Sequence, residues 1–228
     1  MITKKTNLLI ALPIAAVLAL GGCGGDGGTD NNSITNTGIG GDTGGDSGSS
    51  STVTTTGDGS ITACFTTNNT VSYAMTTSFN PPSGSIFLTK LTLGPTTYNG
   101  QAVTGQTYFY SNGTQQTAYW SATNSGVTRI ANMNFDGTIT ADDLFIPQNI
   151  KSGQVATDSD NNNTFFTFVD FETLTLAGKT FYNTCHFKIS IPQIDDQNDS
   201  WYAPGYGLIK RTVNIGADIV TFQYDGTL

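Results

Sequence analysis

The chain has 228 residues, of which 37% are hydrophobic and 11% charged, which is typical of a chain that folds around one core of its own. Nine lysines and arginines stand against seventeen aspartates and glutamates, so the formal net charge is -8. This acidic balance excludes the basic surface with which proteins bind nucleic acid, and we expect no nucleic-acid partner.

The N-terminus has the pattern of an export signal. Lys4 and Lys5 precede Leu8–Leu20, a run of 13 residues without charge. At about 1.5 Å per residue the run spans ~20 Å, too short for the ~30 Å hydrocarbon core of a bilayer. Pro13 also disfavours a continuous helix there. The run therefore predicts a signal peptide rather than a membrane-spanning or buried core helix.

The uncharged run ends in Leu-Gly-Gly-Cys, which closes at Cys23 and resembles the lipobox of bacterial lipoprotein precursors. The resemblance implies cleavage before Cys23, so that residues 1–22 are the signal peptide and Cys23 carries lipid. Gly24 follows where an aspartate would favour retention in the inner membrane. We therefore expect a protein of the bacterial cell envelope, lipid-anchored in the outer membrane, on its periplasmic or its outer side. The alternative is a secreted protein with a free Cys23 thiol.

Residues 23–60 are predicted to be a flexible linker behind the lipidated cysteine. Their Gly, Ser, Thr, Asn and Asp side chains cannot bury enough apolar area to offset the entropy lost on ordering. A glycine-rich linker of about 37 residues has a mean reach of ~30–36 Å. The linker would hold the folded part clear of the lipid headgroups.

Residues 61–228 are predicted to form one β-rich domain, because short aromatic and β-branched runs alternate with polar residues between turn signals. The predicted fold class is all-β, an antiparallel meander forming a curved sheet or half-barrel. The expected strands are 70–77, 85–93, 101–110, 115–122, 127–133, 144–147, 165–176, 180–191, 207–213 and 218–223. Turns are expected at Asn99-Gly100, Asp136-Gly137 and 177–179, among others.

The strand 180–191 fixes the expected directions of two side chains. Alternation puts Cys185 on the apolar face with Phe187, and His186 on the opposite face. If Cys23 carries lipid, Cys64 and Cys185 remain as an even pair in an oxidising compartment, which predicts a disulfide. The alternative is two buried reduced thiols.

The segment 132–143 resembles a twelve-residue calcium loop. The candidate ligands are Asn132, Asn134, Asp136, Thr138 and Asp143, with Gly137 at the sharp turn. The first position is normally aspartate, and the flanking residues are β-like. The same residues also fit a hairpin turn at Asp136-Gly137. Calcium is thus one candidate cofactor, and the alternative is that the chain binds no cofactor.

The residue inventory argues against an enzyme. His186 is the single histidine, and its strand neighbour Cys185 points away from it, so a Cys-His nucleophile pair is not expected. The chain has neither a Gly-x-Ser-x-Gly elbow nor a phosphate-binding glycine loop. Asp170 and Glu172 share one strand face, interpreted as solvated. The acidic residues Asp195, Asp196 and Asp199 are placed in a surface loop, 192–200.

The most distinctive motif is WYAPGYGLIK, residues 201–210. Pro204 restricts φ, whereas Gly205 and Gly207 permit positive φ or a close backbone approach. Trp201 and Tyr202 could plug one end of the sheet. The motif forms either a structural corner with core aromatics or the mouth of an apolar ligand site.

This motif, with Ala177-Gly178-Lys179-Thr180-Phe181 before it and the segment from Leu144 to Gly153 further upstream, resembles a pattern in uncharacterised secreted and lipoprotein domains of bacteria. The resemblance spans about a third of the chain, from Leu144 to Val213. It implies a curved antiparallel half-barrel akin to the Lol-type lipoprotein carriers, and it transfers no catalytic residue.

The expected function is a non-catalytic binding module, attached to a membrane by its N-terminal lipid, for an apolar or lipid-like small molecule. The alternative is a cell-surface or assembly protein that contacts another envelope protein, with calcium as a possible stabiliser. An enzyme is not expected.

Overall fold

The computed structural model describes residues 53–55, 59–78, 85–158, 164–191, 196–215 and 218–227. The predicted signal peptide and Cys23 lie outside these residues, as do most of the predicted linker and Asp195. Within the described segments no helix is long and apolar enough to cross a bilayer.

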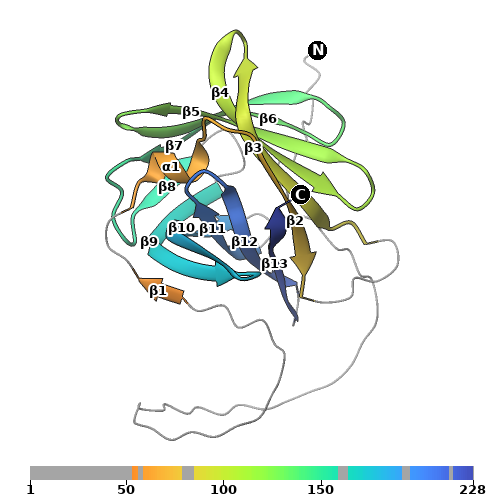
Figure 1. The fold of residues 1–228 in the computed structure, drawn as a ribbon. Coiled ribbons are helices and arrows are strands. Elements are labelled where there is room, and N and C mark those ends of the chain that lie inside the picture. The colour runs from red at the N-terminus through yellow and green to blue at the C-terminus, as the bar shows by residue number, and fades with distance from the viewer. Residues whose placement is uncertain are drawn as a thin grey trace, which may run out of the picture.

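The described strands form an antiparallel meander that curls into a nearly closed barrel (Figure 1). The elements are β1 (Val53–Thr55), α1 (Ile61–Phe65), β2 (Val71–Thr77), β3 (Leu88–Tyr98), β4 (Gln101–Tyr110), β5 (Gln115–Thr123), β6 (Gly126–Met133), β7 (Ile139–Pro147), β8 (Val155–Asp158), β9 (Thr164–Leu176), β10 (Lys179–Ile191), β11 (Asp196–Ala203), β12 (Gly207–Ile215) and β13 (Asp218–Thr227).

Twelve of these strands, β2 to β13, make the barrel. Each pairs with its neighbours in sequence except at β7 and β8, and β13 pairs with β2. The predicted all-β meander is confirmed, and the sheet curls further than a half-barrel. The ladder is interrupted between β7 and β8, which lie side by side without pairing along their described residues. We call this place the seam.

Tight turns set the register of the long hairpins. Asn99 and Gly100 have φ of 49° and 79°, and Ala177 and Gly178 have φ of 46° and 76°. Two successive residues at positive φ match the right-handed twist of the flanking strands. The predicted turns at both places are confirmed, and the second joins two 13-residue strands, β9 and β10.

Two elements lie where the sequence predicts none. Within the predicted linker, β1 pairs with Glu172–Leu174 of β9. The short helix α1 begins after the N-cap Ser60 and buries Ile61, Cys64 and Phe65 completely. Its five residues are too few to show a helical period, which is why pattern analysis misses it.

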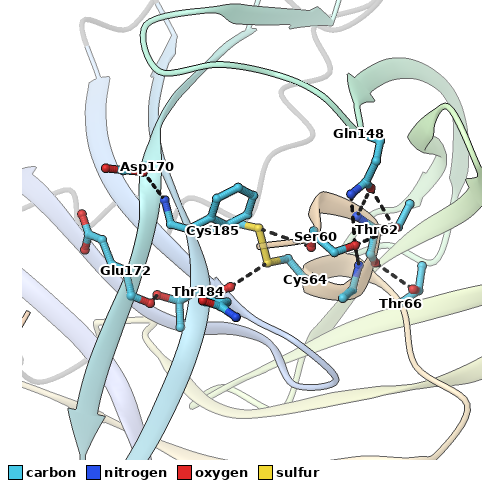
Figure 2. The surroundings of a disulfide bond; sticks show 12 residues. Ser60, Thr62, Cys64, Thr66, Gln148, Asp170, Glu172, Thr184 and Cys185 are labelled. Atoms are coloured by element: carbon cyan, nitrogen blue, oxygen red, sulfur yellow. Dashed lines mark hydrogen bonds between the residues drawn. A yellow bond between two sulfur atoms is a disulfide. The ribbon is translucent and has the colours of Figure 1, made fainter. Parts of the chain in front are cut away.

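The predicted disulfide is present between Cys64 of α1 and Cys185 of β10, with Cα atoms 6.2 Å apart (Figure 2). Both cysteines are fully buried. Because 121 positions separate them, the bond ties the start of the described domain to its C-terminal half.

One predicted loop is wrong. Residues 196–203 form β11, which pairs with β10 and β12, so Asp196 and Asp199 lie on a strand and not in a loop. The strand β8 is also missing from the prediction, and β7 begins at Ile139 rather than Leu144.

An aromatic layer fills the barrel beneath α1. The ring of Phe65 lies 4.4 Å from Trp120, 4.6 Å from Tyr202 and 5.9 Å from Phe187, measured between centroids. These side chains come from α1, β5, β11 and β10, so the helix is packed against several sides of the barrel at once.

Candidate functional site

Beside the aromatic layer the interior holds a buried ion pair. Arg129 of β6 donates from Nε to Oδ2 of Asp142 on β7 at 2.6 Å, and the Asn132 amide donates to the same oxygen. Asp142 Oδ1 accepts from the backbone N–H of Leu144 at 3.1 Å. Both oxygens of this carboxylate are therefore engaged inside the protein.

The Arg129 guanidinium also lies over aromatic rings, 5.8 Å from the centroid of Trp120 and 5.6 Å from that of Phe166. An arginine charge interacts favourably with the faces of aromatic rings when water is excluded. This packing holds the guanidinium in place in an interior where Arg129 is only 4% exposed.

A second buried arginine lies on β12. Arg211 donates from Nε to Ser200 Oγ at 3.1 Å and is 7% exposed. Two buried phenols, Tyr108 and Tyr110, lie near it. Burial raises the pKa of both phenols well above the usual value, so they are neutral hydroxyl groups beside a permanently charged guanidinium.

Together these groups enclose a cavity of about 20 Å³, which is enough for at least one water molecule. The lining residues are Tyr108, Gln116, Thr117, Ala118, Trp120, Arg129, Asn132, Met133, Asn134, Phe166, Tyr202 and Arg211. Both arginines line it, and no aspartate or glutamate is among these described lining residues.

Two polar atoms of the lining side chains lack a partner. Among the described residues, Trp120 Nε1 and Asn134 Oδ1 are buried side-chain atoms without a hydrogen bond. Trp120 is 2% and Asn134 7% exposed. Buried polar groups in native proteins are almost always satisfied, by protein, water or ligand. We call the cavity enclosed by these twelve lining residues the interior cavity.

A separate polar cluster lies on the outer face of β9 to β12. His186 contacts Glu172 Oε1 through Nδ1 at 2.7 Å and Asp199 Oδ1 through Nε2 at 2.8 Å. The Trp201 indole donates to Glu172 Oε2 at 2.7 Å and stacks on the imidazole at 4.3 Å. Lys210 Nζ also lies over the Trp201 indole, 4.6 Å from its centroid.

This outer cluster engages the single histidine completely. Each of its two ring nitrogens lies within hydrogen-bond distance of a carboxylate oxygen. Burial acts to raise the pKa of Glu172, but the hydrogen bonds from His186 and Trp201 outweigh it and the pKa is lowered. The solvated interpretation of Glu172 is wrong, since this residue is 8% exposed. Figure 2 shows Glu172 on the side of the β9–β10 hairpin away from the disulfide. This is the face, opposite Cys185, that the sequence predicts for His186, with which Glu172 pairs.

The candidate calcium ligands lie along the β6–β7 hairpin. Asn132 donates to Asp142 in the interior, and Asn134 donates to Thr138 Oγ1 at 3.1 Å. Asp136 is exposed and accepts from Thr138. The hairpin turn expected at Asp136-Gly137 is confirmed.

Asp143 follows the inward Asp142 and is exposed on the opposite face of β7, so the structure does not bring it together with Asn132. Nowhere in the described ranges do three or more His, Cys, Asp or Glu side chains gather as metal ligands would.

The WYAPGYGLIK motif forms the turn between β11 and β12. Gly205 and Gly207 have φ of 73° and 70°, and the Gly205 N–H donates to the carbonyl of Ala63 in α1. Pro204 lies in the same turn. The two aromatics separate, because Tyr202 packs inside against Phe65 whereas Trp201 stacks outside on His186.

The residues that make the interior cavity were absent from the sequence-based candidates. The signal for them was present, since Arg129 lies between Val127 and Ala131 on one strand face, and Arg211 lies between Ile209 and Val213 on another. An arginine at an inward position of an apolar strand face indicates a buried polar site.

Comparison with protein-family profiles, curated proteins and solved structures finds no match to this chain.

Proposed function

We propose that the chain is a non-catalytic binding module, anchored in a bacterial outer membrane by a lipid on Cys23, that holds a small ligand inside its barrel. The anchor is supported by the Leu-Gly-Gly-Cys sequence after a short uncharged run. The glycine- and aspartate-rich stretch that follows would separate the barrel from the bilayer.

The observation that carries the binding role is the pair of unpartnered buried atoms in the interior cavity. Trp120 Nε1 can only donate, and Asn134 Oδ1 can only accept. Leaving one such group buried without a partner costs about 1–3 kcal/mol. A ligand or ordered water that supplies both partners recovers this free energy, and the cavity has room for it.

The chemistry of the cavity favours a polar ligand over the apolar or lipid-like ligand that the sequence predicts. Apolar ligand sites are lined mainly by hydrophobic side chains with few polar groups. Here two arginines, two asparagines and a glutamine contribute to the lining. An acyl chain would leave Trp120 Nε1 and Asn134 Oδ1 without partners, whereas a small polar molecule would pair with them.

The non-catalytic part of the proposal is supported by the outer cluster. His186 has carboxylates on both ring nitrogens, so neither nitrogen is available to take a proton from a substrate. The disulfide engages Cys64 and Cys185 and removes two thiols that could act as nucleophiles.

Native mass spectrometry of protein extracted from membranes tests the binding role. We expect the wild type to carry one additional small molecule beyond its acyl chains. Trp120→Phe, which removes the indole N–H and keeps a ring, should lose it, and the matched outer variant Trp201→Phe should keep it. The bare acylated mass in all three proteins, with an unchanged interior in a crystal structure, would contradict the proposal.

A second candidate role is contact with another envelope protein. Phe145 of β7 and Val155 of β8 lie at the seam and are 41% and 50% exposed, and Ile139 further along β7 is 50% exposed. Exposed apolar side chains along the two strands that border the seam favour a protein contact. A photo-crosslinking residue at position 145, introduced in intact cells, should give one adduct of defined mass. A crosslinker at the exposed Tyr182 is the control, and equal yields of diffuse adducts would oppose this role.

A further inference from the structure

We infer that the interior cavity binds a small neutral amide, of the size of formamide or urea. This inference rests on the proposed binding role and names the class of ligand. The carbonyl oxygen of the ligand would accept from Trp120 Nε1, and its N–H group would donate to Asn134 Oδ1. Both residues line the cavity.

The first argument is the direction of the two unpartnered atoms. Trp120 Nε1 can only donate. The Thr138 hydroxyl donates to Asp136 Oδ1 at 2.6 Å, so toward Asn134 it can only accept, and it accepts from Nδ2 at 3.1 Å. This contact fixes the Asn134 amide with its nitrogen toward Thr138, and its oxygen is the buried atom without a partner. A ligand that satisfies both atoms must therefore accept at one end and donate at the other.

The second argument is the pairing of charge around the cavity. Arg129 forms an ion pair with Asp142 at 2.6 Å. Arg211 donates to Ser200 Oγ at 3.1 Å and to the Tyr202 hydroxyl. An anion would bring negative charge against the unpartnered amide oxygen, and a cation would lie beside two guanidinium groups. A neutral ligand avoids both repulsions.

The third argument is the distance that the ligand has to span. Asn134 follows Met133, which pairs with Thr117, whereas Trp120 lies along β5 in the opposite direction. The two side chains therefore begin about four residues apart along the ladder, roughly 13 Å at 3.3 Å per residue. One water or hydroxyl oxygen bridges partners at most about 6 Å apart, the sum of two hydrogen bonds.

An amide spans a longer gap, because its acceptor and its donor are separate atoms. The cavity of about 20 Å³ at the same time admits only a few non-hydrogen atoms. Formamide and urea meet both requirements.

Calorimetric titration of the full folded chain at constant ionic strength tests the inference with ligands matched in shape. Formamide is compared with formate, its anionic counterpart, and urea with guanidinium, its cationic counterpart. We expect one saturable site for formamide and urea, with dissociation constants of about 0.1–10 mM, since so few atoms bind no more tightly. Formate and guanidinium should bind more weakly by about 10-fold or more.

Two variants locate the site. Trp120→Phe removes the donor and Asn134→Leu removes the acceptor. Each should weaken formamide binding about 10-fold, because one polar atom of the ligand is then buried without a partner. The matched outer variant Trp201→Phe should bind as the wild type does. Circular dichroism confirms that each variant is folded.

Three results would overturn the inference. They are the absence of saturable heat for both amides in the folded wild type, a charged counterpart that binds as tightly as its amide, and amide binding that both interior variants leave unchanged. A different kind of small molecule found in the membrane-extracted protein would end the amide assignment and leave the binding role intact. An interior that holds ordered water alone, in protein from membranes and after titration, would end both.

Discussion

Removal of the Cys64–Cys185 disulfide should lower stability by a large and calculable amount. The bond closes a loop with a sequence separation of 121 residues. In the chain-entropy model a closed loop of this length restricts the unfolded chain by about 5 kcal/mol at 25 °C. Since the bond joins α1 to β10, its loss also releases the helix whose Phe65 packs on Trp120.

Urea unfolding measures this effect. With a slope of roughly 2 kcal/mol/M for a domain of this size, the double variant Cys64→Ala, Cys185→Ala should unfold at a urea concentration about 2.5 M lower than the wild type. Reduced wild-type protein retains both sulfur atoms and separates the cross-link from lost packing. A midpoint shift below about 0.5 M in both proteins, at unchanged slope, would refute the reasoning.

The remaining predictions address the outer cluster, the β11–β12 turn, calcium and the anchor. Because the pKa of Glu172 is lowered in the folded protein, its contribution to stability is present above the unfolded value near 4.5 and is lost as pH falls through the lower folded value. Glu172→Gln should therefore reduce the fall in melting temperature on acidification. An unchanged fall would contradict the role given to Glu172. Gly207→Ala should destabilise by roughly 1–3 kcal/mol and more than Gly205→Ala, since both have positive φ but only the Cβ at 207 would meet Gln106, at 2.8 Å; equal losses in urea would count against this packing. Calcium at millimolar concentration should not shift the melting temperature, because the candidate ligands do not converge, and a shift of several degrees would revive the loop interpretation. Cys23→Ser should move the protein from the membrane to the soluble fraction, and unchanged fractionation would oppose the lipid anchor.

Much of the fold could be predicted because its signals are local. Asn99-Gly100 specifies a tight turn with two positive φ angles, and alternation around Cys185 and Phe187 specifies which face of β10 is buried. The strand β11 could not be predicted in the same way. Its inward residues Asn198 and Ser200 are polar although they are 6% and 0% exposed, so the segment has the composition of a loop.

The interior cavity could not be predicted because its parts meet only through pairing between distant strands. Ser200 is buried because Arg211 on β12 binds it, and Asp142 is buried because Arg129 on β6 does. Taken alone, each of these polar residues is of a type usually found at the surface. An inward arginine such as Arg129 could have been noticed from alternation, but its partner depends on the register of the barrel.

A crystal structure of protein extracted from membranes tests the central claim most directly, because it locates a bound molecule without reliance on activity. The account predicts electron density for one small polar molecule in the interior cavity, within hydrogen-bond distance of Trp120 Nε1 and Asn134 Oδ1. It also predicts that this density is missing in Trp120→Phe crystals grown from protein prepared identically. Ordered water alone in the interior cavity of the wild type would contradict the account.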